Sequence, residues 1–126
     1  MIEEFLHFVW ECKLFNSNAL QIMDGDSLAI HQFEKYNFTS GPDFSEAQIT
    51  AGESKWAGSA EIHLKSSDWH RHRHSEDFAY DNIILHVIFE DDVPVLNKDN
   101  KPIPTLELKG RISAAILKNY ESLKTK

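Results

Sequence analysis

Three ionisable residues of different types alternate along one short segment of the chain. Glu61, His63 and Lys65 are separated by Ile62 and Leu64, and an extended strand turns successive side chains to opposite faces. We therefore expect a carboxylate, an imidazole and an ammonium group on one face and the two aliphatic side chains on the core face. A metal ligand, a proton acceptor and a cation side by side form a candidate catalytic cluster.

A second carboxylate lies upstream, at a predicted turn. Asp43 follows Gly41 and Pro42, which favour a turn, and it comes just before a strand expected to run to about Ala51. Magnesium prefers oxygen ligands and keeps several waters, so two carboxylates and a substrate phosphate are enough to hold it. Asp43 and Glu61 are therefore two candidate carboxylates of one catalytic site.

His63 and Lys65 would assist this chemistry. A neutral imidazole accepts a proton at about pH 7, whereas a lysine would need a much lower pKa to do so. Lys65, on the same face, would supply a positive charge. In the opposing interpretation, Glu61, His63 and Lys65 are only the solvated face of an amphipathic strand.

Histidines also alternate with arginines in the segment that follows. His70, His72 and His74 come together if this segment is extended, and neutral imidazoles bind zinc and other transition metals. A solvent-exposed polar loop explains the same pattern. In a third interpretation one histidine, with Arg71 or Arg73, reaches the phosphate near the two carboxylates.

His86 interrupts the apolar run from Ile83 to Phe89, which is typical of a central strand. A histidine in such a place is predicted to be a hydrogen-bonded core residue. If its ring faces the same cleft as Glu61, it becomes a third ligand or a proton carrier.

The tryptophans and the cysteine are interpreted as packing residues. Trp10, Trp56 and Trp69 are expected to anchor the core, and Cys12 to be a small buried residue on the first helix. A single cysteine excludes an intrachain disulfide and a four-cysteine zinc site.

Composition predicts one globular domain. The 126 residues are 41% hydrophobic, enough for one core. A net charge of -7 argues against coating nucleic acid by charge alone, but it is compatible with a nuclease site. The sequence has no basic leader before an apolar run and no membrane-spanning stretch, so we expect a cytoplasmic protein. The last residues carry no helix stop, so residues 1–126 are expected to be the N-terminal part of a longer protein.

Local patterns predict a helix, a series of strands and a final helix. Residues 68–78 are expected to form a short helix or an irregular loop. The predicted helices are 2–15 and 112–123, and the predicted strands are 19–23 and 27–33, paired as a hairpin around Asp24 and Gly25, then 43–51, 55–66, 83–89 and 103–108.

This order resembles the PD-(D/E)xK phosphodiesterases, the restriction-endonuclease-like superfamily. In that superfamily an Asp after a turn and an acidic residue on the next strand bind a divalent cation, and a Lys two residues later acts on the attacking water. Asp43 and Glu61 match the first two elements, which implies that they bind Mg²⁺ or Mn²⁺, and the ion would acidify a water and neutralise charge on the phosphate. His63 stands in place of the lysine, and Lys65 would contact the phosphate or take over the role of the lysine from a shifted position.

The resemblance implies an α/β fold, an α+β mixed sheet with a restriction-endonuclease-like core and flanking helices. It implies a metal-dependent phosphodiesterase acting on nucleic acid. The alternative is a catalytically inactive interaction or scaffold domain of the same fold, favoured by the missing lysine and the acidic net charge.

A second resemblance covers most of the chain. The chain is similar to the N-terminal portion of a family of uncharacterised bacterial proteins, catalogued as a domain of unknown function. The members of that family are several times longer. This resemblance implies a shared fold and no particular activity. It is carried by residues 41–44, 56–58, 61–63, 66–69 and 79–86.

Overall fold

A computed structural model describes residues 2–32, 35–36, 44–71, 82–97 and 99–124. The predicted order of helix, strands and final helix is present in it. The elements are α1 (Glu3–Glu11), β1 (Leu28–Gln32), β2 (Lys35–Tyr36), β3 (Phe44–Ala51), β4 (Ser54–Lys65), α2 (Asp68–Arg71), β5 (Ile83–Glu90), β6 (Thr105–Glu107) and α3 (Ala114–Lys124).

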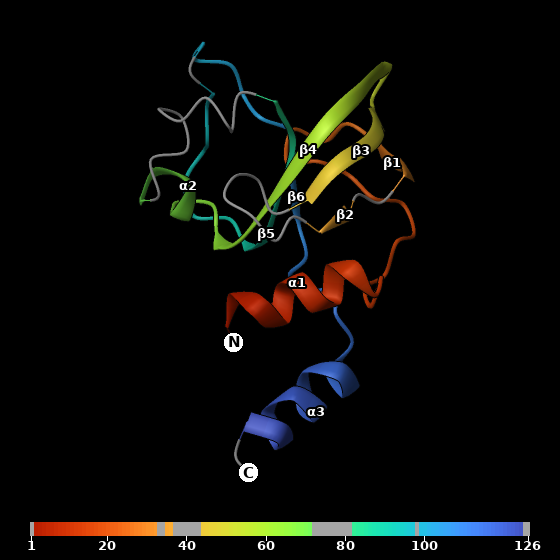
Figure 1. The fold of residues 1–126 in the computed structure, drawn as a ribbon, viewed down its shortest axis with the longest axis vertical. Coiled ribbons are helices and arrows are strands. Elements are labelled where there is room, and N and C mark those ends of the chain that lie inside the picture. Colours follow the sequence, from red (N-terminus) through yellow and green to blue (C-terminus); the bar gives the residue numbers. More distant parts are fainter. Residues whose placement is uncertain (1, 33–34, 37–43, 72–81, 98, 125–126) are drawn as a thin grey trace.

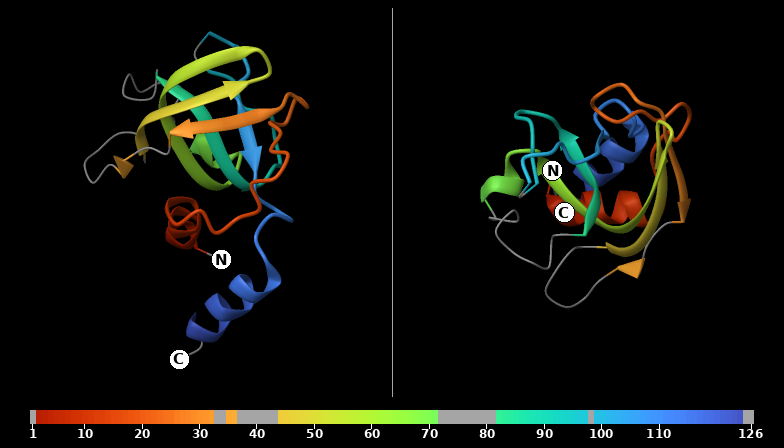
Figure 2. Two further views of the ribbon diagram at one scale, coloured as in Figure 1. Left: turned by 90° about the vertical axis from the view of Figure 1, so that its right-hand side faces the viewer. Right: turned by 90° about the horizontal axis from the view of Figure 1, so that it is seen from above.

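All the strands belong to one mixed sheet. It has six strands in the order β1-β3-β4-β5-β6, with β2 also paired to β3. The strands up to β4 pair antiparallel, whereas β4 with β5 and β5 with β6 pair parallel. Figures 1 and 2 show that the sheet is strongly curved. A mixed sheet with a few helices confirms the expected α+β class.

Helix α1 covers one face of the sheet. Its buried side chains Leu6, Val9 and Trp10 join a core cluster with residues of the central strands, among them Ile62 of β4. Helix α3 lies on the far side of α1 from the sheet (Figure 1 and the left view of Figure 2). Phe5 stacks on Tyr120 of α3 with ring centroids 4.1 Å apart, so α1 is packed on two sides.

The predicted hairpin around Asp24 and Gly25 is only partly correct. The tight turn forms, with Gly25 at a φ of 96°, but residues 19–23 are not a strand and contribute a single bridge from Gln21 to Ser27. The guanidinium of Arg111 donates hydrogen bonds to the carbonyls of residues 16, 18 and 19. Arg111, which is distant in sequence, therefore occupies backbone carbonyls next to the turn that would otherwise be available for strand pairing.

Two of the predicted core residues are exposed. Trp10 and Trp69 are buried as expected, but Trp56 is 45% exposed and Cys12 is exposed. Cys12 lies just after the last residue of α1, beyond the face that packs on the sheet. Trp56 lies in the first part of β4, where every residue from 54 to 57 is exposed.

Gly58 permits a close approach between β4 and the start of β5. The Ser59 N–H donates to the Asn82 carbonyl at 2.9 Å. A Cβ on Gly58 would lie 2.5 Å from that carbonyl oxygen and 2.8 Å from Ile84 Cγ2. Only glycine fits this position without moving the backbone of residue 82.

We expect Gly58→Ala to lower the free energy of unfolding by about 1–3 kcal/mol, because the added methyl group overpacks a site bounded by backbone. Urea unfolding followed by circular dichroism measures this change. Ala57→Ser, which adds one atom at the exposed neighbouring position, is the control and should unfold like the wild type. Equal stability of Gly58→Ala and the wild type would contradict the close approach.

Asp92 holds together the chain segments that leave β4 and β5. Its carboxylate accepts hydrogen bonds from the Ser67 hydroxyl at 2.6 Å, the Ser66 hydroxyl at 2.7 Å and the Ser67 N–H at 2.8 Å. The Ser66 hydroxyl oxygen in turn accepts from the backbone N–H groups of Asp92 and Val93. The Ser67 hydroxyl, followed by that of Ser66, lowers the pKa of Asp92 to about 2.

This Asp92 clamp predicts an acid-sensitive contribution to stability. The folded-state pKa lies below the ordinary value of 3.8, so the unfolded chain binds more protons on acidification. The contribution is complete above about pH 4 and is lost as the pH falls toward about 2. Asp92→Asn should lower stability at neutral pH and weaken its decline over that range.

Urea unfolding at a series of pH values measures the effect of Asp92→Asn. The same change at the exposed Asp99, Asp99→Asn, is the control and should retain the wild-type decline. An unaltered pH dependence in Asp92→Asn would rule out the clamp as its source.

Candidate functional site

The parallel pairing of β4, β5 and β6 lines up polar residues on one face of the sheet. Glu61 pairs in register with His86, and His86 pairs with Thr105. His63 is the next residue of β4 on that face and pairs with Ile88. Partners in parallel strands point to the same side, so strand register alone brings Glu61, His63 and His86 together.

The side chains of Glu61, His63 and His86 form a continuous chain, called here the Glu61–His86 chain. His63 Nδ1 lies 2.7 Å from His86 Nε2, a hydrogen bond in which one ring donates and the other accepts. The two rings are nearly perpendicular, at 79°. On the other side of the ring, His63 Nε2 lies 3.5 Å from Glu61 Oε1.

The Glu61–His86 chain is buried. Glu61, His63 and His86 are exposed by only 4%, 1% and 0%. The interpretation of Glu61 and His63 as part of a solvated strand face is therefore wrong. The predicted alternation is confirmed, since Ile62 and Leu64 belong to the core on the side of α1.

Helix α2 covers the face that carries the Glu61–His86 chain. Its Trp69 is 1% exposed and packs edge-on against His86, with ring centroids 5.2 Å apart. Val95 and Ile103 from the segment before β6 complete this second, smaller cluster. Asp68 fixes the start of α2 because its carboxylate accepts a hydrogen bond from the Lys65 N–H at 3.2 Å.

Lys65 lies at the exposed end of the same face. It pairs in register with Glu90, which forms an ion pair with Lys109 at 2.8 Å. The hydrogen bond from Lys109 lowers the pKa of Glu90, and the same bond raises the pKa of Lys109. Both side chains of this pair and Lys65 are exposed, so this end of the face is polar and accessible. An exposed pair of this kind contributes little to stability.

Of the other histidines and the carboxylate predicted near this cluster, His70 lies in the described part of the chain and is not part of the Glu61–His86 chain. His70 is exposed on α2. Asp43, His72 and His74 lie outside the described residues. Within the described ranges, no group of three or more His, Cys, Asp or Glu side chains is arranged to hold a metal ion.

Sequence reasoning named His86 as an accessory residue but missed the surroundings of its ring. The sequence predicts Trp69 chiefly as a packing residue and gives no signal for Thr105. The register between β5 and β6 places Thr105 beside His86. Nothing in either segment alone indicates that register, because it is set by contacts between distant parts of the chain.

The model of one protein family matches residues 3–126, and its description is "Protein of unknown function (DUF2851)". The chain belongs to the DUF2851 family. This confirms the predicted resemblance to an uncharacterised domain family. No curated protein and no solved structure matches the DUF2851 chain. None of the helices in its described ranges is long and apolar enough to cross a membrane.

We expect His86→Phe to destabilise the DUF2851 domain by about 1–3 kcal/mol, because a buried polar atom of His63 loses its hydrogen-bond partner. His86→Gln restores a polar side chain and should recover part of this loss. Urea unfolding measures both variants, with His70→Gln on the exposed side of α2 as the control. If His86→Phe is as stable as the wild type, the 2.7 Å contact has no structural role.

Proposed function

We propose that the DUF2851 domain binds a divalent cation through Glu61 and His63 and hydrolyses phosphodiester bonds in nucleic acid. The supporting observation is the 3.5 Å distance between Glu61 Oε1 and His63 Nε2, which exceeds the usual length of an N–H···O hydrogen bond. Two atoms that each bind one cation at about 2.1 Å lie about 3.0 Å apart at the right angle of an octahedral site and about 3.4 Å apart at a tetrahedral angle, so the observed separation is near the upper value. The pair therefore fits two ligands of one ion.

His86 supports this assignment as a positioning residue. Metal-binding imidazoles usually use their second nitrogen in a hydrogen bond that fixes the orientation of the ring. In this domain the second nitrogen is His63 Nδ1, held 2.7 Å from His86 Nε2. The hydrogen bond directs His63 Nε2 toward Glu61.

The donor set bears on the identity of the ion. Imidazole nitrogen suits zinc and other transition metals, whereas magnesium prefers oxygen ligands. Of the two ions expected from the sequence, Mn²⁺ fits a Glu61 and His63 pair better than Mg²⁺. A bound cation supplies charge neutralisation at the phosphate and a more acidic water.

The other roles follow from the PD-(D/E)xK resemblance. Asp43 is proposed as a further carboxylate ligand, and the exposed Lys65 as the contact to the substrate phosphate. A restriction-endonuclease-like core is part of the same proposal. It is supported by the antiparallel β1, β3 and β4 followed by the parallel β5, with Glu61 on β4.

Mn²⁺ binding tests the proposal before any cleavage assay. Titration followed by electron paramagnetic resonance should show binding that Glu61→Gln weakens by about 100-fold or more, since loss of a ligand should exceed the 10–100-fold effect of an outer partner. His86→Phe should weaken it by about 10-fold. Glu53→Gln, at an exposed glutamate in the β3–β4 turn, is the control.

Cleavage is then measured on single- and double-stranded DNA and RNA with Mn²⁺ or Mg²⁺. Activity should depend on added metal and should be lost in Glu61→Gln. Wild-type protein that binds no Mn²⁺, or Glu61→Gln protein that binds it equally well, would contradict the proposed site.

A second candidate function is an interaction or scaffold domain of the same fold. The observation that favours it is burial, because Glu61 and His86 are exposed by only 4% and 0% and a buried polar chain also serves to fix a unique core. In this case Glu61→Gln changes stability alone, and the wild type neither binds the metal nor cleaves nucleic acid.

A further inference from the structure

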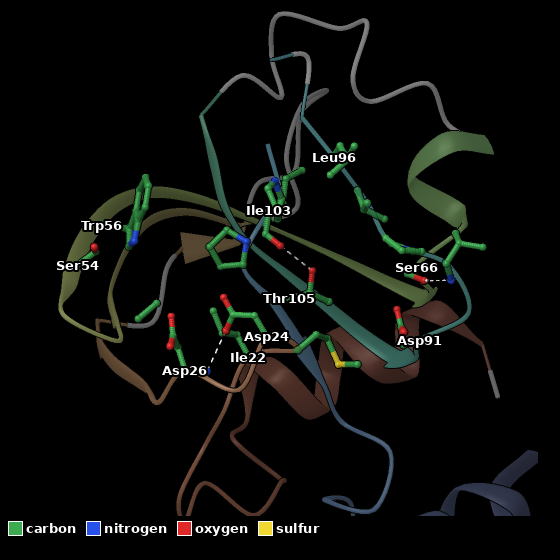
Figure 3. Close-up of a pocket in the computed structure, with 17 residues that line it drawn as sticks. Ile22, Asp24, Asp26, Ser54, Trp56, Ser66, Asp91, Leu96, Ile103 and Thr105 are labelled. Atoms are coloured by element: carbon green, nitrogen blue, oxygen red, sulfur yellow. Dashed lines mark hydrogen bonds between the residues drawn. The ribbon is translucent and has the colours of Figure 1, made fainter. Parts of the chain in front are cut away.

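A pocket of about 580 Å³ opens between Ser66 and three segments that are distant in sequence (Figure 3). The segments are the Ile22–Asp26 turn, the end of the β3–β4 hairpin and the stretch from Asp91 to Thr105. The volume lies within the range of pockets that bind ligands or side chains of a partner.

The walls of the pocket are apolar and partly exposed. Six large hydrophobic side chains are exposed in the described part of the chain, and four of them line this pocket: Met23 at 49%, Trp56 at 45%, Leu96 at 39% and Val93 at 37%. Scattered exposed apolar residues are ordinary, but a contiguous group rimmed by polar residues marks an interaction site. The exposure of Trp56 is therefore explained by its position in the wall of this pocket.

The rim of the pocket is acidic. Asp24, Asp26 and Asp91 line it, and none of its lining residues is lysine or arginine. In Figure 3, Asp24 and Asp26 lie below Trp56 and Leu96. Carboxylates beside an apolar wall attract cations and repel phosphate, so this pocket does not suit the backbone of a nucleic acid.

The loop that carries Leu96 is held in shape. The Asn97 N–H donates to the Lys101 carbonyl at 2.8 Å, and the Asn97 side-chain oxygen accepts from the N–H groups of Asp99 and Lys101. Three prolines, Pro94, Pro102 and Pro104, also line the pocket, and each has a restricted backbone. A preformed wall lowers the cost of ordering on binding.

We propose that this pocket binds a segment of a partner protein in which an aliphatic or aromatic side chain is next to an arginine or lysine. The apolar side chain enters between Trp56 and Ile103, and the cation meets Asp24 or Asp91. A polypeptide is favoured over a small molecule because four of the apolar lining side chains are 37–49% exposed, whereas a small-molecule site encloses most of its ligand. The proposal is independent of cation binding by Glu61.

Selection from a displayed library of random dodecapeptides on the immobilised protein tests the chemistry of the ligand. Peptides that combine basic with large apolar residues should be enriched. Enrichment of peptides without an excess of basic residues, or no enrichment over an empty support, would overturn the proposal.

Binding of a selected peptide is then followed by tryptophan fluorescence, and a change at saturating peptide that is absent in Trp56→Ala is assigned to Trp56, the exposed tryptophan beside the buried Trp10 and Trp69. Trp56→Ala should weaken binding, measured by calorimetry, by about 30-fold or more, as expected for a central aromatic contact. The double variant Asp24→Asn, Asp91→Asn should weaken it by about 10-fold, and added salt should have a similar effect.

Two features keep these variants interpretable. Asparagine at position 24 retains the side-chain oxygen that accepts a hydrogen bond from the Asp26 N–H at 2.9 Å, so the turn is preserved. Asp99→Asn, an exposed aspartate outside the pocket lining, is the matched control and should bind like the wild type. Equal binding by the double variant and by Asp99→Asn would exclude the acidic rim as the recognition element.

Discussion

The parallel pairing of β4 with β5 is the constraint on which the rest of the structure depends. Parallel strands are usually buried on both faces, so the polar face of β4 has to be covered as well as the apolar one. Glu61 and His86 are opposite each other in this pairing. Their side chains are enclosed, and buried polar groups are stable only where they find partners within the protein. The hydrogen bond between His63 Nδ1 and His86 Nε2 meets this requirement for one nitrogen of each ring.

Contacts at both ends of the stretch in which β4 pairs with β5 maintain that pairing. At one end, Gly58 admits the carbonyl of Asn82, which accepts from Ser59. At the other end, Asp92 accepts hydrogen bonds from Ser66 and Ser67. A slip of one residue would turn every side chain of β4 to the opposite face. The two contacts therefore fix the geometry of the Glu61–His86 chain without belonging to it.

Local sequence pattern was sufficient to predict which residues share a face but not what covers that face. The alternation of Glu61 with Ile62 follows from strand geometry, and it is correct. Burial of the polar face depends on Trp69 and Ile103, which reach it from other parts of the chain. The exposure of Trp56 could not be predicted for the same reason. An aromatic residue in a strand is buried only where a second layer of the structure covers it, and the local sequence does not show where that layer lies.

The charge distribution separates the two sites that we propose. Nucleic acid is a polyanion, and Asp24, Asp26 and Asp91 on the pocket rim would repel it. A partner peptide with basic residues would in turn be attracted to this rim and to a chain of net charge -7. One polyanionic ligand cannot occupy both places favourably. Thr105 nevertheless lines the pocket and pairs with His86, so the two sites are neighbours across one strand while their ligands must differ in charge.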